Sequence, residues 1–237
     1  MHKTLIALGV GAAMIVGAIA AQADHNAPVR AGGTDPGNFT NPVPNPYYPL
    51  KAGRIATLRG SEDGARLLER VKTTHTKKTI QGVATTVVVD MLWEEGSLRE
   101  KTYDWYANDN SGNVWYFGEN TAVYNKRGDV VSREGSWKAS VDGAIAGLIM
   151  PADPKATDAY RQEFHFGDAE DQAWIVLRGG SVKVPYGTVD HILRSFEWSR
   201  VEPHIMDTKL YAPGLGIVWE GSFAGGNEQL QLVKISG

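Results

Sequence analysis

Residues 102–119 have the sequence TYDWYANDNSGNVWYFGE, and this stretch decides the fold class. Its two aromatic-rich runs, Tyr103–Tyr106 and Val114–Phe117, flank a segment of Asn, Asp, Ser and Gly at 108–113. Aromatic and β-branched residues favour strands, whereas Asn, Asp and Gly favour tight turns. The stretch therefore predicts a β-hairpin, and with it an antiparallel sheet.

The rest of the chain extends this pattern. A second hairpin is predicted between Thr121–Tyr124 and Val130–Arg133, because the turn-forming sequence NKRGD lies between them. Only Val141–Met150 is predicted to be helical, with Asp142 as its N-terminal cap and Pro151 ending it. We therefore expect an all-β protein with one short helix.

The chain is similar to itself at an offset of 105 residues. The matched positions hold turn glycines and large aromatic residues: Gly82 with Gly187, Trp93 with Trp198, and Tyr106-Ala107 with Tyr211-Ala212. This pattern predicts two similar β-meander halves, 49–119 and 154–221, with residues 120–153 as an insertion. We expect the halves to form a single β domain, residues 49–237, as a strongly curved antiparallel sheet or a barrel.

Residues 1–23 have the pattern of a secretory signal peptide. A short basic start precedes an uncharged apolar run, and Ala21-Gln22-Ala23 supplies the small residues of a cleavage site after Ala23. A membrane anchor is the competing interpretation of this run. The expected mature protein is periplasmic or secreted, soluble and monomeric, without an integral membrane segment. It would begin with a proline-rich lead-in, residues 24–48, where regular helix and central strands are not expected.

The composition excludes several classes of function. The 237 residues include no cysteine, which excludes disulfides, thiolate metal sites and a cysteine nucleophile. The net charge of -3 argues against a nucleic-acid partner, which would favour a basic face. The sequence contains no phosphate-binding glycine loop, dinucleotide fingerprint or zinc-binding histidine motif, so we expect no cofactor.

One acidic cluster has the chemistry of a weak cation site. Asp168, Glu170 and Asp171 lie close to Glu163 and His165 in the sequence. Their spacing does not match a calcium-binding loop. An ordinary solvated turn is therefore favoured, and no metal site is predicted.

Short motifs are spread over nearly all of residues 39–235. They are NPYYPL (45–50), TYDWYA (102–107), GNVWYFGE (112–119), GSW (135–137), VDGA (141–144), IMPA (149–152), YRQE (160–163), VPYG (184–187) and YAPGLG (211–216). Together they resemble an uncharacterised family of secreted bacterial proteins and lipoproteins, and YAPGLG also resembles a motif of lipocalin-like or lipoprotein-carrier-like curved sheets. The chain departs from the family in having no lipobox cysteine and no aromatic residue in its first strand, 54–57. The resemblance implies no established activity and no catalytic residues.

The aromatic block supplies the candidate binding site. In a strand, Tyr103 and Trp105 point to one face, and Asp104 and Tyr106 to the other. Aromatic residues on both faces indicate that one face is core and that the other lines a cavity, unless all of the rings serve packing alone. The residues predicted to form the cavity wall are Tyr103, Trp105, Trp115, Phe117 and Trp137.

Two carboxyl groups, Asp104 and Glu119, lie within the same block. If they faced an apolar cavity, loss of solvation would raise the pKa of each, and they could act as general acids or bases. If they lay at a strand edge, they would pair with Arg or Lys and have only a structural role. Asp104 and Glu119 are therefore the candidate catalytic residues.

Three functions are compatible with these observations. The preferred one is an exported protein that binds a small amphipathic or hydrophobic ligand in an aromatic-lined cavity, with Asp104 or Glu119 as the polar anchor. The first alternative is an isomerase, lyase or hydrolase that uses the same carboxyls, and the sequence leaves open whether the protein is an enzyme. The second is an envelope interaction module whose exposed aromatic residues contact a partner protein or glycan. A cavity with an ionisable pair of perturbed pKa would favour the enzyme, and a filled core with an exposed aromatic patch would favour the module.

Overall fold

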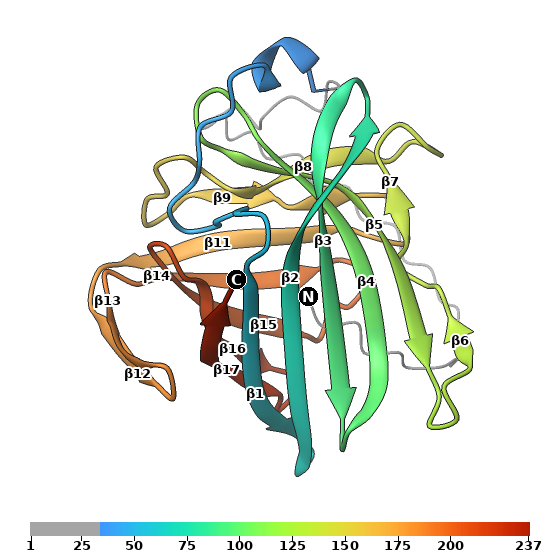
Figure 1. Cartoon of the computed structure of the whole chain (residues 1–237), viewed down its shortest axis with the longest axis vertical. Helices are drawn as coiled ribbons and strands as arrows, with labels where there is room; N and C mark the ends of the chain where they lie inside the picture. Colours follow the sequence, from blue (N-terminus) through green and yellow to red (C-terminus); the bar gives the residue numbers. More distant parts are fainter. Residues whose placement is uncertain (1–33) are drawn as a thin grey trace, which may run out of the picture.

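The computed structural model describes residues 34–237, and nearly all of their regular structure is β. Fifteen strands form one antiparallel sheet that curls into a nearly closed barrel (Figure 1). The all-β, strongly curved architecture predicted from the sequence is confirmed. The predicted signal peptide, 1–23, and the first part of the proline-rich lead-in lie outside the described residues.

The first wall of the barrel is an up-and-down run of long strands that stand side by side in Figure 1. These strands are β1 (Ile55–Glu62), β2 (Ala65–Ile80), β3 (Val83–Glu94), β4 (Ser97–Asn108) and β5 (Val114–Tyr124). Shorter strands continue the sheet beyond β5: β6 (Val130–Ser132), β7 (Trp137–Lys138), β8 (Ile145–Met150) and β10 (Glu163–Phe164).

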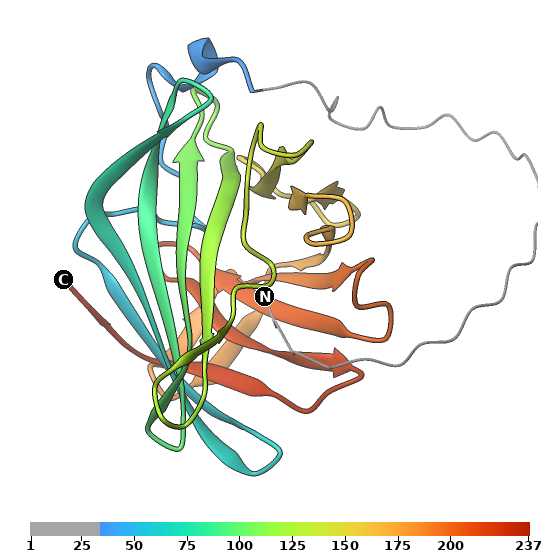
Figure 2. The ribbon, with the colours of Figure 1, turned by 90° about the vertical axis from the view of Figure 1, so that its right-hand side faces the viewer.

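The second wall runs across the first and faces it (Figure 2). Its strands are β9 (Ala159–Arg161), β11 (Asp171–Arg178), β14 (Leu193–Ser199), β15 (Met206–Ala212), β16 (Gly216–Ala224) and β17 (Gln229–Ser236). The pairing of β17 with β1 joins the two walls. At the other side, β9 and β10 are consecutive in the chain but stand at opposite ends of the strand order, so the barrel is nearly closed.

Two elements lie outside this sheet. The strands β12 (Ser181–Val184) and β13 (Gly187–Asp190) form a separate hairpin, and its buried valines belong to the same hydrophobic cluster as residues of β1, β16 and β17. A single 3₁₀ turn, η1 (Pro36–Phe39), precedes the barrel.

Both predicted hairpins are confirmed. The strands β4 and β5 pair across the turn at 109–113, with Tyr106 opposite Tyr116. The turn carboxylate Asp109 accepts hydrogen bonds from the backbone N–H groups of Ser111 and Asn113, each at 2.9 Å. The second hairpin joins β5 to β6. The Asn, Asp and Gly residues within each turn are thus sufficient to predict where the two hairpins turn.

The helix predicted over Val141–Met150 is wrong. Asp142 and Gly143 have φ values of 49° and 80°, so the chain turns at these residues instead of starting a helix. The next residues form β8, which pairs with β5 on one side and β10 on the other. Because Ile149 and Met150 become buried in this position, packing overrides the local helical pattern.

The internal repeat stays a prediction, and the order of the strands is compatible with it. Trp93 lies in β3 and Trp198 in β14, while Tyr106 lies in β4 and Tyr211 in β15. The strands β3–β4–β5 and β14–β15–β16 are each three consecutive antiparallel neighbours. The matched residues therefore occupy corresponding strands of two meanders.

The described end of the lead-in closes one end of the barrel. This segment is the blue chain that passes over the upper end in Figure 1. The buried Asn45 side chain donates from Nδ2 to the carbonyl oxygens of Gly112 and Pro151, each at 2.8 Å. Its Oδ1 accepts from the backbone N–H groups of Tyr47 and Tyr48. One amide group thus fixes the lead-in against two loops of the barrel.

Replacing Asn45 with alanine is expected to lower the free energy of unfolding by about 2–3 kcal/mol, because buried backbone groups lose their partners. Urea denaturation of the full chain would measure this change. Asn41→Ala is the matched control, since the Asn41 side chain is exposed and its replacement is expected to change stability by less than about 0.5 kcal/mol. Equal effects for the two variants would show that the Asn45 side chain does not anchor the segment.

Candidate functional site

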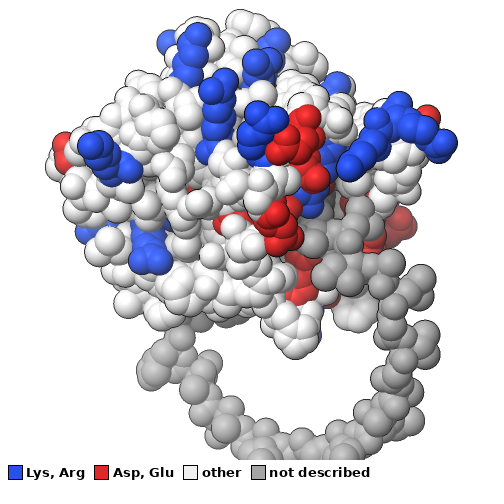
Figure 3. Space-filling model, turned by 90° about the horizontal axis from the view of Figure 1, so that it is seen from below, with Lys and Arg blue, Asp and Glu red and all other residues white. Residues whose placement is uncertain are grey.

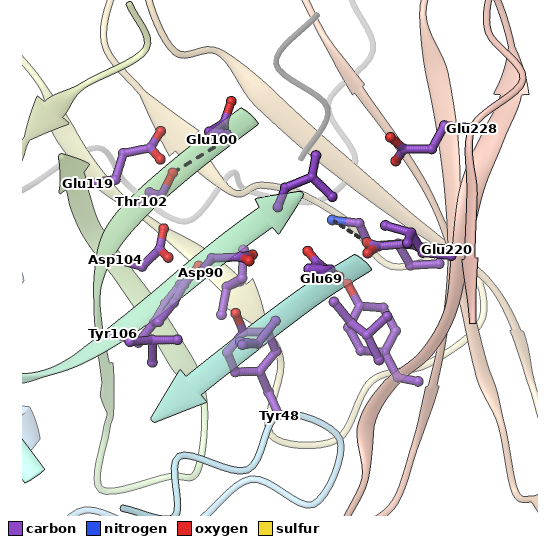
Figure 4. Close-up of a pocket in the computed structure, with 18 residues that line it drawn as sticks. Tyr48, Glu69, Asp90, Glu100, Thr102, Asp104, Tyr106, Glu119, Glu220 and Glu228 are labelled. Carbon is purple, nitrogen blue, oxygen red and sulfur yellow. Dashed lines mark hydrogen bonds and ion pairs between the residues drawn. The ribbon is translucent and has the colours of Figure 1, made fainter. Parts of the chain in front are cut away.

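The barrel encloses a cavity of about 110 Å³ between its two walls. Strands β2 to β5 supply one side and β15 to β17 supply the other, while Tyr48 and Tyr106 lie at one end (Figure 4). This volume holds several water molecules or a small organic group, and it is below the roughly 300–1,000 Å³ typical of sites for drug-sized ligands. The cavity therefore suits a ligand of few atoms.

Carboxyl groups dominate the polar part of the lining. They are Glu69, Asp90, Glu100, Asp104, Glu119, Glu220 and Glu228. Within residues 34–237, Lys209 is the one basic residue that lines the cavity. Viewed from below, Asp and Glu side chains gather towards the middle of the surface, and Lys and Arg lie mainly around them (Figure 3).

Lys209 is engaged by a neighbouring carboxylate. Its Nζ lies 2.9 Å from Oε2 of Glu197 and 4.0 Å from Oε2 of Glu220. Burial acts to raise the pKa of Glu197, but the charge of Lys209 together with the hydrogen bonds from Lys209 and Ser195 lowers that pKa to about 2. Burial likewise acts to lower the pKa of Lys209, but the charges of Glu197, Tyr211 and Glu220 together raise that pKa well above its usual range. The two groups therefore form a buried ion pair.

Glu69 and Asp90 form a second pair, which consists of two acids and has no counter-ion among the described residues. The side chains point into the cavity from the adjacent strands β2 and β3 (Figure 4). Although each residue as a whole is partly exposed, Glu69 Oε2 and Asp90 Oδ1 are shielded from solvent and accept no hydrogen bond from the described residues. Burial raises the pKa of Asp90 to about 7, and burial together with the charges of Asp90 and Glu220 raises the pKa of Glu69 well above its usual range. At neutral pH the pair holds a proton in place of a counter-ion.

The two predicted catalytic carboxyls both line the cavity. Asp104 on β4 lies directly opposite Glu119 on β5 in the strand register. The hydroxyl of Tyr116 donates to Oδ1 of Asp104 at 2.6 Å, and the hydroxyl of Thr121 donates to Oε2 of Glu119 at 3.0 Å. Each carboxylate is thus oriented by a hydroxyl of β5. Their catalytic role stays a prediction.

A glycine on β5 allows the close strand contact beside Glu119. Gly118 has a φ of 126°, and a Cβ at this position would lie 2.4 Å from the carbonyl oxygen of Trp137. Gly118→Ala is expected to lower the free energy of unfolding by about 2–3 kcal/mol, through backbone strain and this clash. Gly96→Ala is the matched control, because Gly96 has a φ of 83° with open space around its Cβ, and only the strain of about 1 kcal/mol applies. Thermal unfolding of both variants would separate the clash from the strain.

None of the five aromatic residues predicted to form the wall lines the cavity. Tyr103 is 37% exposed, and the buried Trp105 ring lies 3.2 Å from the Nζ of Lys78. Trp115 and Phe117 both pack against Phe39. Because strand alternation places Asp104 and Tyr106 inside, Tyr103 and Trp105 point to the opposite face.

Trp137 lies closer to the cavity than the other four rings. It packs edge-on against Tyr116, with ring centroids 5.3 Å apart, and its Nε1 donates to Oε2 of Glu163 at 2.6 Å. Both partners are buried, so Trp137 belongs to the core beside the cavity. None of the five rings therefore lines the 110 Å³ cavity, and a direct ligand contact by any of them stays a prediction.

The acidic cluster at 168–171 is a turn with partners of its own. Asp168 pairs with Nδ1 of His165 at 3.1 Å, and Glu170 lies 3.5 Å from Arg200. Among residues 34–237 no group of three or more His, Asp or Glu side chains is arranged to hold a metal ion.

Sequence reasoning missed Glu69, Asp90, Lys209 and Glu220. Charged residues that alternate with apolar ones along a strand ordinarily indicate a solvent-facing side. One signal was present, because Asp90 interrupts the apolar run VVVDMLW at 87–93. A carboxyl group flanked by apolar residues on both sides indicates a strand covered on both faces.

No family model matches the chain, and no curated protein matches it. A search of solved structures found a Bacteroides fragilis NCTC 9343 protein that is described as exported, with a YmcC-like fold. It is 12% identical, the match covers 81% of this chain and 99% of that chain, and the TM-score is 0.47. A protein of Parabacteroides distasonis ATCC 8503 described as a lipoprotein is 11% identical over 82% of this chain and 100% of that chain, with a TM-score of 0.44. In the part of the chain from 34 to 237, no helix has both the length and the apolar character needed to cross a membrane.

Proposed function

We propose that this protein is exported and binds a small amphipathic ligand inside the barrel. The observation that carries the proposal is the cavity, whose lining combines carboxyl groups with aliphatic side chains and tyrosine rings. Such a mixture suits a molecule with one polar and one apolar end. Export rests on the signal-peptide pattern of residues 1–23.

The apolar half of the lining supports an amphipathic ligand. Val88 and Leu92 project into the cavity from the same strand as Asp90, and Ile217 and Leu230 project from the second wall. Because side chains on a strand alternate, Val89 between Val88 and Asp90 points out of the barrel. The wall therefore offers an aliphatic surface beside the carboxyls.

Acid–base catalysis is a second candidate function, and one observation favours it. The Glu69–Asp90 pair shares a proton near neutral pH inside a cavity, as general acids and bases often do. If the protein is an enzyme, these carboxyls are better candidates than Asp104 and Glu119, which already accept hydroxyl hydrogen bonds.

A binding module on the outer surface is a third candidate. Trp174 and Phe223 are 43% and 56% exposed, and both rings contact Phe196. These three rings form an aromatic row on the outside of β11, β14 and β16. An outer partner would contact this row, and Trp174→Ala would then weaken its binding without changing occupancy of the cavity.

A cavity-filling variant tests the proposed function. Protein purified from its own host would be analysed by native mass spectrometry for a bound small molecule. Val88→Phe fills the lumen and is expected to abolish the adduct, whereas Val89→Phe adds the same ring on the outer face and should retain it. Circular dichroism would confirm that both variants keep the β fold. An adduct that persists in Val88→Phe would place the ligand outside the cavity, and no adduct in the unaltered protein would contradict the proposal.

A further inference from the structure

The charges that face the cavity are strongly unbalanced. The titratable side chains around Glu69 and Asp90 come from every wall: Tyr48, Glu100, Asp104, Tyr106, Glu119, Lys209, Tyr211, Glu220 and Glu228. Of the described residues in this set, Lys209 alone is basic, and it is 2.9 Å from Glu197, which lies outside the set. Lys209 also lies 4.0 Å from Glu220 on β16, so among the lining carboxyls of β2, β3 and β16, Glu69 and Asp90 are the ones that form no ion pair with a described basic residue.

Two buried oxygen atoms mark where a cation would bind. Glu69 Oε2 and Asp90 Oδ1 are shielded from solvent, and no hydroxyl, amide or basic group of the described residues donates to them, so that neighbouring carboxyls are their hydrogen-bonding contacts in the cavity. A buried polar atom without a partner costs free energy, and a donor that enters the cavity would recover it. A proton shared by the two carboxyls satisfies only part of their hydrogen-bonding capacity, because two carboxylates can accept hydrogen bonds from several donors.

The surroundings of this pair favour an ammonium group over a metal ion. Val71, Val88 and Leu92 lie beside Glu69 and Asp90 in the lining. Calcium requires six to eight oxygen ligands around one point, and within residues 34–237 no group of three or more His, Asp or Glu side chains is arranged to hold a metal ion. An alkylammonium ion instead needs N–H acceptors at one end and an apolar surface for its carbon chain.

From this juxtaposition we propose that the ligand of the cavity is a small alkylammonium ion. Its N–H groups donate to Glu69 and Asp90, and Glu220 supplies further negative charge from the opposite wall. Its short carbon chain lies against Val88 and the neighbouring aliphatic side chains, within the available 110 Å³. The inference deepens the proposed function and rests on it.

The proposal implies that binding displaces protons. The pKa of Asp90 is raised to about 7, so the pair must lose a proton before it can hold an ammonium ion as two carboxylates. Affinity is therefore expected to rise between pH 5.5 and pH 7.5, by about tenfold or more. Isothermal titration in two buffers of different ionisation enthalpy would detect the released proton.

Binding of butylammonium would be measured first. Butanol is its neutral analogue, and calcium chloride tests whether the cavity prefers a metal ion. Titrations use the full mature chain at 0.15 M NaCl. We expect butylammonium to bind at least tenfold more tightly than butanol. Glu69→Gln, which keeps the shape of the side chain, is expected to weaken butylammonium binding at least tenfold and to leave butanol binding unchanged. Glu134→Gln, an exposed carboxyl away from the cavity, is the matched control and should change neither.

Three other results would contradict either the ammonium proposal or the proposed function. Equal binding of butanol and butylammonium would overturn the ammonium proposal and keep the small-ligand function. Tighter binding of calcium, lost in Glu69→Gln, would replace the ammonium ion with a metal ion. Failure of both organic probes to bind, together with no bound molecule in protein from its own host, would overturn the proposed function as well.

Discussion

Lys209→Met is expected to lower the free energy of unfolding at pH 7 by about 3–5 kcal/mol. The substitution removes the positive charge 2.9 Å from Glu197 while keeping an apolar stem of similar length. Glu197 is then left as a buried carboxylate without a counter-ion, and breaking a buried pair by removing one partner typically costs this much. The hydroxyls of Ser195 and Tyr211, which donate to Glu197 at 2.7 and 2.8 Å, compensate only in part.

The dependence on pH identifies the cause. In the unaltered protein, the pKa of Glu197 is about 2, below the value of about 4.3 in the unfolded chain. The contribution of Glu197 to the free energy of unfolding is therefore present above pH 4.3 and is lost as the pH falls towards 2. Without Lys209, burial raises the pKa of Glu197 instead, so the deficit of Lys209→Met should be smaller at pH 4 than at pH 7.

The double variant Lys209→Met/Glu197→Gln is the control for charge. It removes both members of the pair and is expected to recover most of the lost stability, since no unpaired charge remains. Urea denaturation of the single and double variants at both pH values would measure this. A deficit that stays constant with pH, and that the double variant does not recover, would show that Lys209 acts through packing.

The sequence predicts the barrel well because its information is local. The turns at 109–113 and 125–129 are specified by Asn, Asp and Gly, and the alternation of Tyr103 to Tyr106 correctly separates two faces. The prediction for Val141–Met150 is wrong because the structure of this segment depends on a contact that is distant in the sequence. Its apolar residues are compatible with helix or strand, and only the open edge of β5 decides between them.

The site is predicted less completely because it depends on which face is the inner one. The sequence points to Asp104 and Glu119 because they lie in the aromatic block; both line the cavity, and their catalytic or anchoring role stays a prediction. The inner face also carries Glu69 and Asp90, whose strands meet β15 and β16 across the lumen only after the sheet curls. No periodicity within one strand reveals that carboxyls from opposite walls converge. For the same reason, the sequence leads to the wrong face for the cavity wall, because Tyr103 and Trp105 point away from the side that Asp104 and Tyr106 share.

The second large effect is a loss of stability as the pH rises. The pKa of Asp90 is raised to about 7 in the folded protein, above about 3.9 in the unfolded chain, and that of Glu69 is raised as well. Stability from such groups is fully present below the unfolded pKa and is lost as the pH rises through the folded pKa. Between pH 4 and pH 8, the Glu69–Asp90 pair is therefore expected to account for a fall of several kcal/mol, on the order of 4, in the free energy of unfolding.

Asp90→Asn should therefore be more stable than the unaltered protein at pH 8, and its stability should vary less between pH 4 and pH 8. Glu134→Gln changes the net charge equally at an exposed site and should leave the pH profile unchanged. Repulsion between surface charges could also weaken the protein at high pH, but 1 M NaCl screens it at distances beyond about 3 Å. The effect of the buried pair should persist in 1 M NaCl. If salt abolishes the pH dependence, or if the double variant Glu69→Gln/Asp90→Asn keeps it, the proton is held outside this pair, and the electrostatic argument for an ammonium ligand fails.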